Sequence, residues 1–114
     1  MHRVWNRFVR LIVIAALVVP AGAIVAGDLA VGRATVEARC QTCHGMDGVA
    51  TLAMAANLSG QQREYLIIQL QAFRSDQRQH PQMSIIAQSL SDDDIENVAE
   101  WYSSIKVSVE MPGQ

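Results

Sequence analysis

The chain has 114 residues, half of them hydrophobic, and a formal net charge of −2. This length allows one small domain and no more. The slightly acidic balance disfavours a nucleic-acid partner, because neutralising phosphates needs a surplus of lysine and arginine.

The first 26 residues have the layout of a secretory signal peptide. A positively charged start precedes the uninterrupted apolar run Leu11–Val19, and Pro20 and small residues follow it. The charged start consists of His2, Arg3, Arg7 and Arg10. We expect cleavage between residues 23 and 27, with Ala26 or Gly27 favoured. The alternative is an uncleaved membrane anchor, since the 17 residues from 11 to 27 are just long enough to span a bilayer.

Either arrangement places the domain outside the cytoplasm, which in a bacterium means the periplasm. Without the signal, six basic and eleven acidic side chains remain, so the domain carries about −5. Its core is marginal by itself, because only about 87 residues remain. Docking through a dense ring of lysines is not expected, since Lys106 is the only lysine.

A first helix is predicted from Leu29 to Cys40, with Asp28 as its cap. Its apolar and small positions at helical spacing are Leu29, Gly32, Val36 and Cys40. This spacing aims one stripe at the core. Gly32 weakens the helix, so we expect another helix to cross closely there.

The segment Cys40-Gln41-Thr42-Cys43-His44 contains both cysteines of the chain and a histidine directly after the second. C-x-x-C-H is the sequence mark of covalent c-type haem attachment. A thioredoxin-like dithiol would need a βαβ context, and a zinc site would need at least a third protein ligand. A disulfide here would close too short a loop to stabilise much. We therefore predict one covalent haem c, held by thioether bonds to Cys40 and Cys43 and ligated by His44, without which the chain folds poorly.

Residues 45–48 form a turn-rich exit from the motif, and Thr51–Asn57 is predicted to be a loop on the histidine side of the haem. A second helix is predicted from Gly60 to Arg74 or Ser75. The pair Ser59 and Gln62 fits a capping box at its start.

The C-terminal half begins with a polar segment, residues 74–83, predicted to be a surface loop that turns inward at its end. A short helix is expected over residues 84–90. The last helix begins after Ser91, with Asp94 completing a capping-box-like pair. Its apolar positions are Ile95, Val98, Ala99, Tyr102 and Ile105. Residues 107–114 form a frayed tail, and no stretch alternates like a strand, so the predicted fold is all-α.

The second axial ligand of the iron is best supplied by Met83, which ends the polar loop 39 residues after His44. His80 is the rival, because imidazole also binds iron well, and an open site is the third possibility. The other methionines of the domain lie too near the motif or in the tail: Met46, Met54 and Met111. Methionine opposite histidine raises the reduction potential. A haem propionate is expected to pair with Arg78 or Arg74, with Tyr65 and Trp101 as weaker donors.

In this order and spacing, the residues resemble those of class I c-type cytochromes. The chain is most similar to the short bacterial branch that includes single-haem periplasmic cytochromes and the halves of di-haem cytochrome c-four. The resemblance covers about residues 32–105. Its matching pieces are Gly32, Cys40–Gly45, Leu58–Gln61, Tyr65, Leu66, Leu70, Phe73, Arg78, Pro81–Ser84, Leu90–Ile95, Trp101 and Tyr102.

The resemblance implies a small class I cytochrome c fold, in which the N- and C-terminal helices cross near Gly32 with Tyr102 or Trp101 against it. It also implies His44 as proximal ligand and Met83 as distal ligand. One departure is Ala56, since the family usually has a proline two residues before the position of Leu58. This departure leaves the hydrogen-bond partner of His44 open.

These observations predict a periplasmic electron carrier and not an enzyme, with its cytochrome domain over residues 27–106. The expected donor is a periplasmic dehydrogenase, and the acceptor is an oxidase or another cytochrome. Contact with a membrane is expected only if the signal is an uncleaved anchor. One alternative is a dedicated cytochrome subunit of a dehydrogenase complex, and a weaker one is a haem enzyme or gas sensor with an open iron site.

Overall fold

A computed structural model describes residues 26–113, so the predicted signal peptide lies almost entirely outside the described residues. Within them the chain is all-α, as predicted, with no strand. The helices are α1 (Leu29–Arg39), α2 (Gln41–His44), α3 (Arg63–Arg74), α4 (Pro81–Gln88) and α5 (Asp92–Ser104). None of the helices among residues 26–113 combines the length and the apolar character needed to span a bilayer.

The packing of α1 against α5 is the most extensive helix contact of the fold. Gly32 makes it possible, because a Cβ atom there would overlap the carbonyl oxygen of Asn97 and would lie 3.3 Å from the Cβ of Trp101. The predicted crossing at Gly32 is therefore confirmed, with Trp101 as its aromatic neighbour. The other aromatic candidate, Tyr102, is fully buried in the core.

Local hydrogen bonds explain where α1 and α5 begin. The Asp28 side chain accepts from the backbone N–H groups of Ala30 and Val31, at 2.8 and 3.1 Å. Ser91 and Asp94 form a complete capping box, in which each side chain accepts from the other residue's N–H, at 3.1 and 3.0 Å. Both predicted caps are confirmed.

A small core lies between α1, α3 and α5. Its buried members are Val36, Leu66, Val98, Ala99 and Tyr102. At its edge, Arg63 on α3 pairs with Glu96 and Glu100 on α5, and this partly buried ion cluster ties the two helices together.

The predicted start of the second helix is wrong. α3 begins at Arg63, with Gln62 as a cap that makes no side-chain hydrogen bond. The Ser59 hydroxyl instead donates to the carbonyl of Asp47, at 2.5 Å. Gly60 has a φ of +63°, in the left-handed region that interrupts a helix, and its N–H donates to Tyr102 at the end of α5.

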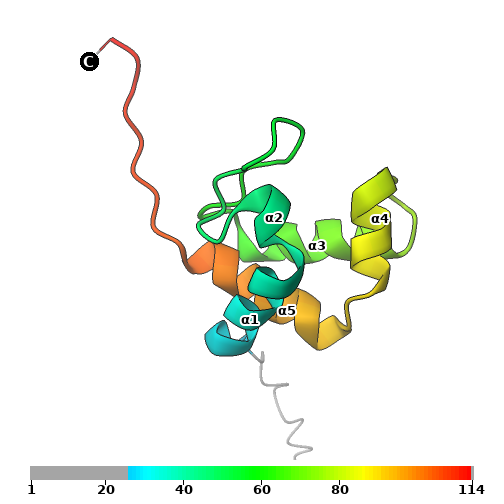
Figure 1. Ribbon diagram of the computed structural model, residues 1–114. Helices are drawn as coiled ribbons and strands as arrows, with labels where there is room; N and C mark the ends of the chain where they lie inside the picture. The colour runs from blue at the N-terminus through cyan, green and yellow to red at the C-terminus, as the bar shows by residue number, and fades with distance from the viewer. Residues whose placement is uncertain (1–25, 114) are drawn as a thin grey trace, which may run out of the picture.

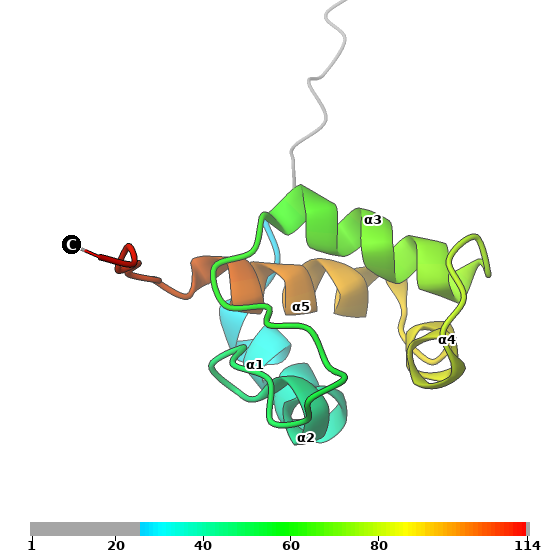
Figure 2. The ribbon, with the colours of Figure 1, turned by 90° about the horizontal axis from the view of Figure 1, so that it is seen from above.

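The predicted start of the fourth helix is also wrong. α4 begins at Pro81 instead of Ser84, so Met83 lies in its first turn and not in a loop. Proline suits this position, because the first helical residue needs no N–H donor. Figures 1 and 2 show α2 and α4 on the same side of α3, towards its opposite ends, while the C-terminal tail extends away from the helices.

Candidate functional site

The C-x-x-C-H segment forms a tight helical turn at the end of α1. Cys40 is the cap residue between α1 and α2, and its carbonyl accepts from the N–H groups of Cys43 and His44, at 3.2 and 3.0 Å. Gly45 ends the turn with a φ of +73°, and its N–H returns to the carbonyl of Gln41. Both thiols and the imidazole therefore project from a single turn.

Cys40 and Cys43 are free, half-buried thiols. Burial raises the pKa of the Cys40 thiol to about 11, so this thiol stays protonated at neutral pH. Among residues 26–113, no group of three or more His, Cys, Asp or Glu side chains is gathered to hold a metal ion. The described residues therefore offer neither the disulfide nor the zinc site that the motif alone leaves open.

The ring of His44 is held by the loop that follows it. Its Nδ1 lies 2.8 Å from the carbonyl oxygen of Ala56. Because a carbonyl only accepts, Nδ1 carries the proton and Nε2 presents its lone pair. The residue that departs from the expected proline thus supplies the partner through its backbone. A carbonyl carries no side-chain signature, so the residue pattern alone could not choose it, although the family resemblance points to a backbone carbonyl of this loop.

The loop from Val49 to Asn57 is held against α2 by Thr51 and is braced internally by Asn57, as expected of a loop on the histidine side. The Thr51 hydroxyl and N–H donate to the carbonyls of Thr42 and Cys43, at 2.6 and 3.0 Å. The Asn57 side chain accepts from the N–H of Ala50 at 2.8 Å. Thr51 and Asn57 thereby fix the loop that carries the Ala56 carbonyl.

Two aromatic residues of α5 hold the segment after His44 from the other side. The buried hydroxyl of Tyr102 donates to the carbonyl of Gly45, and the indole N–H of Trp101 donates to the carbonyl of Met46, both at 2.9 Å. Burial raises the pKa of Tyr102, so it remains a neutral donor. Trp101 was expected as a weak propionate donor, but its N–H is already used here.

Met83 lies partly buried in the first turn of α4, and its backbone N–H donates to Nδ1 of His80 at 3.3 Å. His80, the rival iron ligand, is thus the helix cap. The other methionines offer less: Met54 is 92% exposed and Met111 60% exposed, while Met46 packs against the core.

The candidate propionate partners differ in the hydrogen bonds that their side chains already make and in their exposure. Arg74 is committed to Asp92, at 2.5 Å, and to the carbonyl of Leu90. Arg78 is exposed and donates to Gln69 at 2.5 Å. Tyr65 is 45% exposed on α3.

The residues on the motif fit a covalent haem. Two unpaired thiols lie on the same turn as an imidazole, and the Ala56 carbonyl leaves Nε2 of that imidazole able to bind a metal. The sequence also predicts a second ligand for the iron of such a group, the thioether of Met83, and this residue lies on α4.

Comparison with known proteins supports the same assignment. Residues 27–101 match the protein family described as cytochrome c oxidase, cbb3-type, subunit III. Cytochrome c-554(548) of Halomonas halodenitrificans is 40% identical over 82 residues, which cover 69% of this chain and 98% of that protein. Cytochrome c4 of Pseudomonas aeruginosa is 36% identical over 86 residues, which cover 75% of this chain and 42% of that protein.

A further relative is the thiosulfate dehydrogenase electron acceptor of Stutzerimonas stutzeri, 36% identical over 69 residues. The match covers 58% of this chain and 32% of that protein. The chain thus spans nearly all of the Halomonas cytochrome but less than half of the other two relatives.

Proposed function

Because this chain belongs to the class I c-type cytochromes, we propose that it is an exported carrier of single electrons in the periplasm. Members of this family carry electrons and are not enzymes, and one C-x-x-C-H motif provides for one covalent haem c. We infer that the electron comes from a periplasmic dehydrogenase and passes to an oxidase or another cytochrome. Residues 1–26 act in this proposal as the export signal.

The observation that carries the proposal is the hydrogen bond between His44 and Ala56, at 2.8 Å. It fixes the orientation and tautomer of the imidazole, so that Nε2 is available to the iron without rearrangement. Cys40 and Cys43 hold the haem by thioether bonds, and these bonds prevent its loss. When bound, the haem supplies a one-electron couple between iron(III) and iron(II).

Met83 is the proposed distal ligand. Its place in the first turn of a helix, rather than in a loop, supports a fixed position for the thioether sulfur. A fixed pair of axial ligands keeps reorganisation on electron transfer small and excludes external ligands from the iron. Arg78 is the favoured propionate partner over Arg74, because Arg74 is engaged by Asp92 and Leu90. Tyr65 remains a candidate donor on α3.

The test of the ligand pair is the weak absorption band near the red edge of the visible spectrum that marks a bond between iron(III) and methionine sulfur. Met83→Ala and Met83→His should both abolish this band, and Met83→His should lower the reduction potential. Met54→Ala is the matched control, because Met54 is 92% exposed. A band that survived Met83→Ala would remove Met83 from the site and leave His80 or an open position.

The name of the Stutzerimonas relative, a thiosulfate dehydrogenase electron acceptor, supports a dehydrogenase as donor. The second candidate is a dedicated subunit of such a dehydrogenase complex, with the same chemistry inside a permanent interface. Recovery of the haem-loaded protein from its own periplasm distinguishes the two. A shuttle should be recovered mostly free at moderate ionic strength, whereas a subunit should co-purify with a catalytic chain in a fixed ratio.

A further inference from the structure

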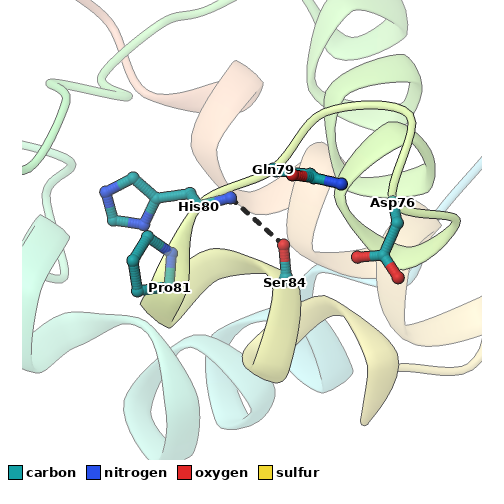
Figure 3. A pocket seen from close by; sticks show the side chains of 5 residues that line it. All are labelled: Asp76, Gln79, His80, Pro81 and Ser84. Atoms are coloured by element: carbon teal, nitrogen blue, oxygen red, sulfur yellow. Dashed lines mark hydrogen bonds between the residues drawn. The ribbon is translucent and has the colours of Figure 1, made fainter.

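His80 occupies the cap position of α4, three residues before Met83. The Nδ1 atom of its ring accepts from the backbone N–H of Met83 at 3.3 Å. The backbone N–H of His80 donates to the Ser84 hydroxyl at 3.2 Å. Figure 3 shows the second of these bonds across the open hollow where His80, Pro81 and Ser84 meet. Two bonds, one to Met83 and one to Ser84, therefore close the first turn of α4, in a variation on the capping box.

The imidazole of His80 is itself held by α3. Its ring meets Phe73 edge-on, with centroids 6.5 Å apart and an interplanar angle of 75°. Phe73 is buried, and the guanidinium carbon of Arg78 lies 4.5 Å from the centroid of its ring. This contact orients the imidazole so that its Nδ1 faces the first turn of α4.

We propose that His80 is a positioning residue for the distal side of the haem. Its cap bonds close the first turn of α4, and so fix the backbone from which the Met83 side chain reaches the iron. This inference rests on the proposed role of Met83 as distal ligand. It gives the second histidine of the domain a task other than ligating iron.

The experiment compares three variants of the haem-loaded protein: His80→Ala, His80→Phe and His80→Asn. Alanine removes both the cap and the ring, phenylalanine keeps a ring without an acceptor, and asparagine restores a good cap acceptor. Gln82→Ala is the control, because Gln82 is exposed in the same turn.

The readouts are the red-edge band of the oxidised protein and carbon monoxide binding by the reduced protein, which requires the distal ligand to leave. His80→Ala and His80→Phe should weaken the band and strengthen carbon monoxide binding about fivefold, the factor for losing a typical helix cap. His80→Asn should return both readouts to within about twofold of the unchanged protein.

Two outcomes would overturn the inference: His80→Ala behaving like Gln82→Ala, or His80→Asn failing to restore the readouts. Met83→Ala, measured alongside, distinguishes this failure from failure of the ligand assignment. If Met83→Ala abolished the band while His80→Ala left it intact, only the inference about His80 would fall. If Met83→Ala left the band intact, the distal ligand would be wrong and the role of His80 would fall with it.

Discussion

Gly32 lies where α1 and α5 approach closely. Whether this close approach stabilises the fold can be tested by the sign of the stability change on one substitution. In an exposed helix, replacing glycine by alanine stabilises by about 1 kcal/mol, because alanine is the better helix former. At Gly32 the added Cβ would overlap the carbonyl oxygen of Asn97. We therefore expect Gly32→Ala to destabilise the fold by about 1–3 kcal/mol, as overpacking does.

Chemical denaturation of the haem-loaded protein measures this difference. Arg33→Ala is the control, since Arg33 is exposed on the same helix, and its effect should stay within about 0.5 kcal/mol. A gain in stability for Gly32→Ala would mean that the helices separate there at little cost.

Some residues of the site could be predicted from the sequence and others could not, and the difference depends on how far along the chain their interaction partners lie. Cys40, Cys43 and His44 were predictable, because the chemistry of haem attachment fixes their types and spacing. The support of His44 was not, because its partner is a backbone carbonyl twelve residues away. The sequence suggests His80 only as a ligand, because histidine is not among the usual helix caps.

At the scale of elements, α4 is held at its far end as well as at its cap. Arg39, next to Cys40, donates to the carbonyl and the hydroxyl of Ser89 at the end of α4, at 3.0 and 2.6 Å. This side chain joins the helix that leads into the haem motif to the helix that carries Met83. The two proposed axial ligands are thereby linked through protein as well as through the haem.

We expect Arg39→Ala to lower the stability of α4 by about 1 kcal/mol, because two hydrogen bonds are lost at an exposed position. Amide hydrogen exchange within residues 81–88 should then accelerate about fivefold, with little change in α1 beyond its last turn. Arg33→Ala again serves as control, because Arg33 is an exposed arginine on the same helix. Unchanged exchange in α4 would show that packing on α3 alone fixes this helix.

The start of each helix shows why some elements were predictable and others were not. Asp28 and Ser91 bond to N–H groups two or three residues ahead, so the sequence near the cap contains the whole interaction. Ser59 has the same local pattern, but its hydroxyl bonds to Asp47, twelve residues back. The left-handed Gly60 and its bond to Tyr102 then exclude a helix there. Long-range contacts decided the case in which local propensity gave the wrong answer.

For the whole molecule, the size of the core leads to the last prediction. Only nine hydrophobic side chains among the described residues are buried, and several of these belong to the α1–α5 crossing. A core of this size contributes too little apolar burial to offset the conformational entropy of ordering some 87 residues. Such small domains usually depend on a covalent cross-link or a bound metal for stability, and here the thioether-bound haem can provide both.

We therefore expect the chain without haem, produced as the double variant Cys40→Ser and Cys43→Ser, to have a free energy of unfolding near zero. Its circular dichroism should show a weak helical signal and no cooperative thermal transition, in contrast to the haem-loaded protein under the same conditions. Serine is close to cysteine in size, so the loss would reflect the missing haem rather than altered packing at Cys40. A cooperative, native-like transition in the haem-free variant would show that the α1–α5 crossing and the α3 ion cluster stabilise the fold without the cofactor.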